Sequence, residues 1–122
     1  MSANHNGSID NAFSIVDMAK ESGADAVKLQ TYRPDTITMK MNTPEFMIEG
    51  GLWDGQSLYE LYEIAFMPWD WHKPIIERAK QLGLDCFSSP FDKTAVDFLE
   101  SLDVIHPSFI KFVPFTLSPL RI

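Results

Sequence analysis

The chain has 122 residues, of which 45% are hydrophobic and 22% are charged, as in an ordinary soluble globular domain. Its formal net charge is -7, and its 10 lysines and arginines are scattered, which disfavours a nucleic-acid-binding surface. A single cysteine excludes a disulfide framework, and the sequence shows no signal peptide and no apolar run of membrane-spanning length. We therefore expect a cytoplasmic protein with no membrane or nucleic-acid partner.

The first predicted unit is an amphipathic helix followed by a short strand. Ser8 is the predicted N-cap, apolar residues recur at helical spacing after it, and Gly23 ends the helix. Residues 25–32 then have the length and apolar content of a strand. Residues 33–55 break this rhythm, being rich in Thr, Pro, Met and Gly, and a short helix is predicted over residues 57–65.

The same unit then returns. A second helix has its apolar stripe before Gly83, and a strand is predicted over residues 84–88; both copies share the pattern AK..G.D. A third, weaker copy starts at the N-cap Asp92 and ends in a candidate strand at residues 109–113. Alternating helices and strands predict parallel strands joined by crossover helices, and hence an α/β fold.

A barrel fits this pattern better than an open Rossmann-type sheet, because no glycine-rich phosphate turn follows the first strand. In a (β/α)8 barrel, the loops after the strands build the active site, so the elaborated residues 33–55 would lie on the functional face. A closed barrel takes about 250 residues. The 122 residues therefore predict a partial TIM barrel with about three parallel strands.

Lys28 and Gln30 interrupt the apolar strand 25–32 at alternate positions. Alternation predicts that Val27 and Leu29 face the helices while Lys28 and Gln30 point into the barrel. A buried ammonium group needs a negatively charged partner, so Lys28 indicates an anionic ligand. The alternative is that Lys28 is simply solvated at the edge of an open sheet.

Other strand ends and one helix entry supply further polar candidates. Either Ser88 or Ser89 could donate a hydrogen bond to a phosphate or carboxylate, and Lys111 is a second lysine within an apolar run. Asn4 and His5 precede a helix N-terminus, where they serve either as ligand donors or as an entry turn. His72 is interpreted as a structural or surface histidine, and no pair of histidines has the spacing of metal ligands.

Several motifs together resemble the sialic acid synthase family, most closely its pseudaminic acid synthase branch. They are SANHNGS, GADAVKLQTY, GGLWDG followed by LYELY, and SSPFD, and the resemblance covers residues 1 to about 104. It implies a TIM-barrel synthase that condenses phosphoenolpyruvate with an open-chain acetamido sugar, forming a nine-carbon 2-keto-3-deoxy acid in carbohydrate biosynthesis. Members of the family are homodimers, and a divalent metal, manganese or magnesium, typically activates their sugar aldehyde.

The resemblance also implies roles for particular residues. Lys28 and Gln30 match a strand of the family that contacts phosphoenolpyruvate and lies by the substrates, and Ser89 matches a hydroxyl residue that contacts the phosphate-bearing ligand. Lys111 matches a lysine of the next strand, but the family's serine and glutamate fall on Pro114 and Thr116. The metal ligands and the C-terminal sugar-binding domain have no counterpart in residues 1–122.

We therefore expect residues 1–122 to be a truncated N-terminal part of a synthase barrel domain, inactive by itself. The alternatives are a non-catalytic fragment or a free-standing anion-binding α/β module. The synthase interpretation predicts that Lys28, Ser89 and Lys111 surround one pocket.

Overall fold

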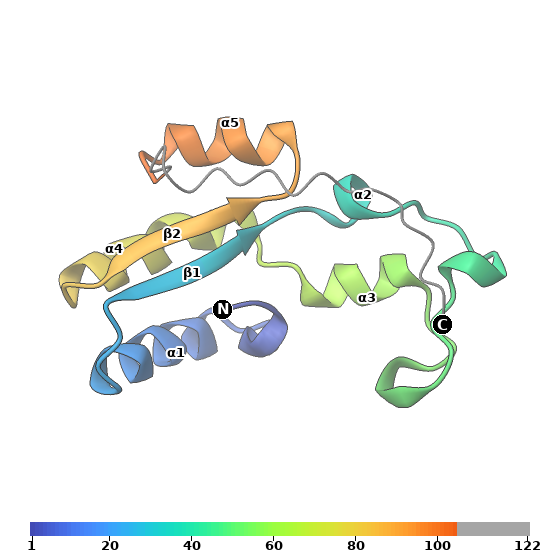
Figure 1. Ribbon diagram of the computed structural model, residues 1–122, viewed down its shortest axis with the longest axis horizontal. Coiled ribbons are helices and arrows are strands. Elements are labelled where there is room, and N and C mark those ends of the chain that lie inside the picture. The colour runs from blue at the N-terminus through green and yellow to red at the C-terminus, as the bar shows by residue number, and fades with distance from the viewer. Residues whose placement is uncertain (105–122) are drawn as a thin grey trace.

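The computed structural model describes residues 1–104, which form a small parallel sheet covered by helices (Figure 1). Strand β1, Ala26–Thr31, pairs in parallel with β2, Asp85–Pro90, in a register that sets Gln30 opposite Ser89. This confirms an α/β fold with parallel strands and crossover helices. The third strand predicted at residues 109–113 lies outside the described residues.

Five α-helices are described in residues 1–104, together with short 3₁₀ helices in the segments before and between them. The α-helices are α1, Ile9–Glu21; α2, Pro34–Ile37; α3, Leu58–Ala65; α4, His72–Gln81; and α5, Lys93–Ser101. The 3₁₀ helices are η1, Ala3–His5; η2, Pro44–Phe46; η3, Gly51–Trp53; and η4, Trp69–Trp71. Within residues 1–104, no helix is long and apolar enough to cross a membrane.

The predicted helix starts are confirmed by their caps. Ser8 accepts a hydrogen bond from the Asn11 amide at the start of α1, and Asp92 accepts one from the Thr94 amide at the start of α5. At α3, Ser57 and Glu60 form a reciprocal capping box. These polar side chains satisfy amide groups that have no partner inside the helix, which explains why α1, α3 and α5 begin where they do.

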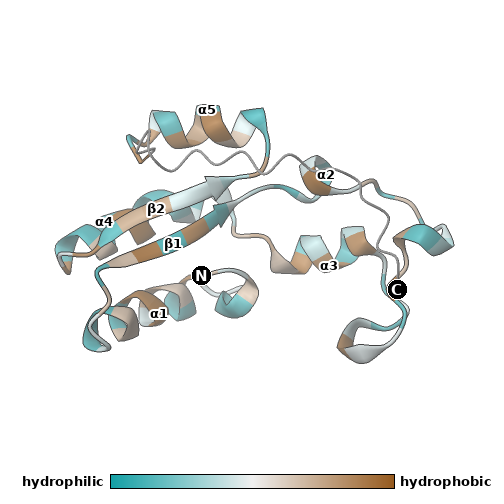
Figure 2. Ribbon diagram, in the orientation of Figure 1, coloured by the Kyte–Doolittle hydropathy of each residue, from teal (hydrophilic) through white to brown (hydrophobic). Residues whose placement is uncertain are grey.

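The core lies between one face of the sheet and helices α1 and α4. Val27 and Leu29 of β1 pack there with Leu84, which immediately precedes β2, and with Met67. The helices contribute Ala12 and Val16 from α1 and Ile75 and Ala79 from α4. Figure 2 shows that both strands become more polar toward their arrowheads. The apolar part of the sheet therefore builds the core, while its carboxyl edge carries polar side chains.

The segment between β1 and α3 extends beyond the carboxyl ends of the strands (Figure 1). Its fold is held locally, by an antiparallel bridge between Met47 and Ser57 and by hydrogen bonds between Ile48 and the Gly55–Gln56 turn. Leu52, at its far end, is 91% exposed. The elaborated loop predicted after the first strand thus lies at the edge where barrel enzymes build their sites.

Candidate functional site

Lys28, Gln30 and Ser89 lie on the face of the sheet that points away from α1 and α4. Along β1, buried and more exposed side chains alternate, with Val27 and Leu29 buried in the core. Lys28 and Gln30 therefore project from the opposite face, as predicted from strand alternation. Since Gln30 is the register partner of Ser89, these two polar side chains lie next to each other on that face.

Lys28 is exposed, which differs from the buried ammonium group expected from the sequence. Within residues 1–104, no hydrogen bond or ion pair reaches its side-chain nitrogen. A second cation lies nearby, because the pKa of the Met1 amino group is lowered first by burial and then by the charge of Lys28. The two described strands do not enclose this face. The Lys28 ammonium group is therefore not a buried charge that needs a negatively charged partner.

Gln30 is half-buried and is held by the N-terminal segment. Its Oε1 accepts a hydrogen bond from the Ser2 hydroxyl at 2.7 Å. The space beside it, lined by Met1, Ser2, Tyr32, Ala65 and Met67, is too small to hold a water molecule. The Gln30 carbonyl oxygen is thus engaged by Ser2, and the donor that this side chain can offer to a ligand is its amide NH₂.

The structure separates the two serines that the sequence left as alternatives. Ser88 is buried on the helix side, where its hydroxyl lies 2.6 Å from that of Thr31. Ser89 is half-buried on the opposite face. Of these two serines, Ser89 is therefore the one available to a ligand that also meets Gln30.

Asn4 and His5 shape the turn before α1. Asn4 is exposed and accepts a hydrogen bond from the Ser2 amide, whereas the His5 side chain is fully buried edge-on against Trp71. His5 Nδ1 accepts from the Gly7 amide at 3.1 Å, and its Nε2 makes no hydrogen bond of good geometry within residues 1–104. This arrangement suits an entry turn, and a ligand-binding role for Asn4 and His5 stays a prediction.

Burial lowers the pKa of His5, although the backbone carbonyl of Ala65 partly opposes this effect. Burial also lowers the pKa of His72, which is fully buried and is therefore not the surface histidine that the sequence allowed as one of two interpretations. Both imidazoles therefore favour their neutral form.

Arg33 is a cation at this edge that the sequence analysis did not single out. It lies two residues after the end of β1, at the N-cap of α2, and its guanidinium carbon lies 4.0 Å from the centre of the Trp69 ring. Trp69 is itself fixed, because its indole N–H donates to the Tyr32 carbonyl at 3.2 Å and its ring stacks on Phe98. The signal in the sequence was an arginine placed immediately after a strand that ends in polar residues.

The described residues do not fit the divalent metal that the family resemblance implies. Within residues 1–104, no group of three or more His, Cys, Asp or Glu side chains could hold a metal ion. Lys111, the remaining residue predicted to contact the anionic substrate, lies outside the described residues. The predicted pocket of Lys28, Ser89 and Lys111 therefore stays a prediction.

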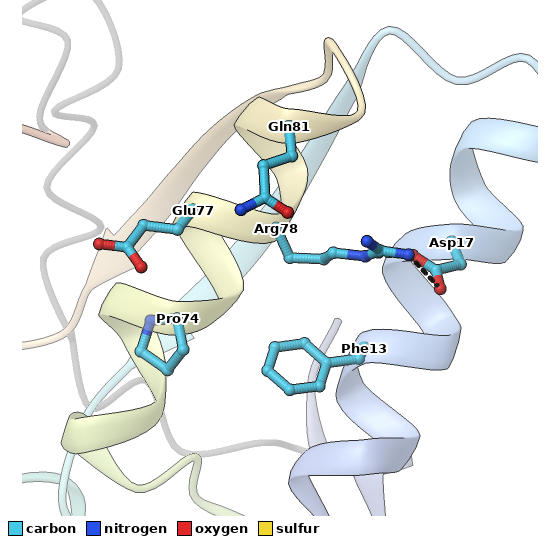
Figure 3. A pocket seen from close by; sticks show the side chains of 6 residues that line it. All are labelled: Phe13, Asp17, Pro74, Glu77, Arg78 and Gln81. Carbon is cyan, nitrogen blue, oxygen red and sulfur yellow. Dashed lines mark hydrogen bonds and ion pairs between the residues drawn. The ribbon is translucent and has the colours of Figure 1, made fainter.

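A groove of about 390 Å³ lies elsewhere, between α1 and α4 (Figure 3). Its lining residues are Phe13, Asp17, Pro74, Glu77, Arg78 and Gln81. Figure 3 shows Arg78 reaching from α4 to Asp17 on α1, which closes the groove at that point. This groove belongs to the helix layer and not to the polar edge of the sheet.

Comparison with known proteins identifies the family. Residues 15–111 match the sequence profile of the NeuB family, which is most of the chain. The chain belongs to the NeuB family. It is 50% identical over 112 residues to the pseudaminic acid synthase of Campylobacter jejuni and 48% identical over 103 residues to that of Helicobacter pylori. These matches cover 92% and 84% of this chain, but 33% and 30% of the relatives, so the chain spans about a third of their length.

Solved structures of NeuB-type proteins share the fold. The N-acetylneuraminic acid synthetase of Leptospira borgpetersenii, in complex with citrate, matches with a TM-score of 0.66 and 22% identity, over 84% of this chain and 31% of that one. The spore coat polysaccharide biosynthesis protein SpsE of Bacillus subtilis matches with a TM-score of 0.56 and 30% identity, over 83% and 25%. The two parallel strands and their helices thus correspond to part of a NeuB-type TIM barrel.

Proposed function

We propose that this chain is the N-terminal part of the barrel domain of a pseudaminic acid synthase-type enzyme. In the proposed reaction, phosphoenolpyruvate, water and an open-chain acetamido sugar give a nine-carbon 2-keto-3-deoxy acid and inorganic phosphate. The observation that carries the proposal is the 50% identity to a pseudaminic acid synthase over 92% of the chain. Residues beyond this chain would complete the site, so we expect residues 1–122 to bind substrate without turning it over.

Charge and register support a phosphoenolpyruvate subsite on the face of the sheet that carries Lys28. Phosphoenolpyruvate carries a carboxylate and a phosphate, which need a cation and neutral donors. Lys28 would supply the charge, while Gln30 and Ser89, paired in register, would supply an amide and a hydroxyl donor. Lys111, Asn4 and His5 are further proposed contacts.

The work of these residues would be to bind and orient. Carbon–carbon bond formation needs the methylene carbon of phosphoenolpyruvate next to the aldehyde carbon of the sugar. Holding the phosphate and carboxylate on fixed donors restricts that carbon to one approach, and positioning of this kind supplies a large part of many enzymatic rate enhancements. A cation beside the phosphate also stabilises the charge that leaves with it.

Calorimetric titration of residues 1–122 with phosphoenolpyruvate tests this proposal. We expect saturable binding that weakens as ionic strength rises, because screening acts on exposed charges. Lys28→Met should weaken it on the order of tenfold, the loss expected for one charge-assisted hydrogen bond. Lys80→Met is the matched control, since Lys80 is an exposed lysine on α4. No heat at millimolar ligand, or an equal loss in both variants, would contradict the proposal.

A competition experiment separates a synthase site from a general anion-binding module. A synthase-type site should prefer phosphoenolpyruvate over inorganic phosphate, because it has contacts for the carboxylate as well. Equal affinity for the two would favour the anion-binding module, and binding of neither would favour a non-catalytic fragment.

A further inference from the structure

Three polar side chains form a buried network on the helix side of the sheet. Thr31 and His72 are fully buried, and Ser88 is 9% exposed. The Thr31 hydroxyl lies 2.6 Å from the Ser88 hydroxyl and 2.8 Å from His72 Nε2. None of the three faces the proposed ligands, so the proposed binding contacts do not account for them.

The hydrogen-bonding groups around His72 indicate which atom donates and which accepts at each contact of the network. His72 Nδ1 lies 3.4 Å from the Pro68 carbonyl oxygen, which can only accept, so Nδ1 carries the proton of the neutral ring. His72 Nε2 is then an acceptor, and the Thr31 hydroxyl donates to it. The Thr31 oxygen in turn accepts from Ser88. Each hydroxyl thus has one preferred orientation.

The network joins four elements of the fold at the carboxyl ends of the strands. Thr31 ends β1, Ser88 lies near the end of β2, and His72 begins α4. The His72 ring also packs edge-on against Phe98 of α5, with ring centres 5.3 Å apart. The network therefore contacts the carboxyl ends of both strands at once.

The neighbours of the network are the proposed ligand donors. Gln30 precedes Thr31, and Ser89 follows Ser88, and each projects from the opposite face of its strand. When the Thr31 and Ser88 side chains are held on the helix side, the direction of Gln30 and Ser89 is set as well. Apolar residues could fill the same space without any desolvation cost, whereas a satisfied polar network favours one arrangement.

We propose that His72 is a positioning residue: through Thr31 and Ser88, it holds the two strand ends so that Gln30 and Ser89 present their donors to one anionic substrate. The substrate part of this inference rests on the proposed function. The positioning of the two side chains does not depend on it, and can be measured without ligand.

The test compares a network-free variant with the natural chain by NMR. The variant Thr31→Val/Ser88→Ala/His72→Phe replaces all three partners by apolar groups, which leaves no buried donor unsatisfied. We expect the side-chain NH₂ signals of Gln30 to shift and the hydrogen exchange of the Gln30 and Ser89 amides to accelerate. Affinity for phosphoenolpyruvate should fall on the order of tenfold, as for the loss of one aligned hydrogen bond. Ser14→Ala is the control, because it removes an exposed side-chain hydrogen bond on α1.

Milder variants keep the test decisive should the triple variant unfold. Ser88→Ala removes only the first donor and should cause smaller changes at Gln30 and Ser89, whereas Thr31→Ser keeps the hydroxyl and should leave the Gln30 signals and the exchange of both amides near their natural values. Unchanged Gln30 signals and unchanged exchange of both amides in a folded network variant would overturn the positioning role. Shifted signals with unchanged affinity would overturn its link to substrate. Shifted signals in a chain that never binds phosphoenolpyruvate would support the positioning and refute the proposed function.

Discussion

Arg78 on α4 donates two hydrogen bonds to Asp17 on α1, from Nε to Oδ1 at 2.8 Å and from Nη2 to Oδ2 at 2.9 Å. The pair bridges two neighbouring helices across the groove in Figure 3. The hydrogen bond from Arg78 is the main cause of the lowered pKa of Asp17. Both side chains are more than a third exposed, at 39% and 38%, so water and salt screen the interaction.

A double-mutant cycle with Asp17→Asn and Arg78→Gln should therefore show a small favourable coupling between the two side chains. The coupling is measured from the free energies of unfolding in urea. It should shrink further in about 1 M salt, where the screening length falls to roughly 3 Å. A coupling that is indifferent to salt would mean that packing, and not charge, joins α1 to α4.

Mildly acidic pH should destabilise the fold through His72. Burial, as the largest cause, lowers the pKa of His72 below its ordinary value of 6.5, although Asp70 and the Pro68 and Trp69 carbonyls oppose this. The unfolded chain then binds a proton at a higher pH than the folded chain does. The stability contributed by the neutral ring is complete above about pH 6.5 and is lost as the pH falls toward the folded-state pKa.

Urea midpoints measured between about pH 7.5 and 5.5 would show this loss of stability, and His72→Gln should reduce it. Part of the pH dependence should remain in that variant, because burial also lowers the pKa of His5. An identical pH dependence in the natural chain and in His72→Gln would contradict the assignment.

Cys86 should react slowly with thiol reagents while the chain is folded. Burial raises the pKa of its thiol to about 11, and only the thiolate is an effective nucleophile. Against an unperturbed pKa of about 8.5, labelling near neutral pH should be slower by a factor on the order of 100 or more. Disulfide-exchange labelling with and without urea measures the ratio, and comparable rates would show that Cys86 is accessible. Because it is the chain's sole cysteine, the signal has one source.

Two leucines provide a matched pair for testing the core. Leu29 is fully buried between the sheet and α1 and α4, whereas Leu52 is 91% exposed in the segment after β1. Leu29→Ala should lower the free energy of unfolding by about 2–5 kcal/mol, because it removes buried methyl groups and leaves a cavity. Leu52→Ala should change it by less than about 0.5 kcal/mol. Similar losses in both variants, measured by urea unfolding, would contradict the described core.

The local features of the fold could be predicted from the sequence. Ser8, Ser57 and Asp92 mark the helix starts, and Gly23 and Gly83, which adopt positive φ, follow the helix ends. Each signal depends on contacts within about one helical turn, or on the twofold alternation of a strand. For the same reason, the sequence correctly assigned Lys28 and Gln30 to the face opposite Val27 and Leu29.

Contacts between distant residues required the folded chain. His72 meets Thr31 across 41 positions, and Thr31 meets Ser88 across 57, so no local pattern could identify the network. The sequence also suggested a buried Lys28, but its burial depends on which strands enclose that face. Periodicity and capping by themselves determined α1, α3, α4, α5 and the two strands, but not α2 and the 3₁₀ helices of residues 33–55. The tertiary structure decided which polar groups meet, because only the packing of β1, β2 and α4 brings them within hydrogen-bonding distance.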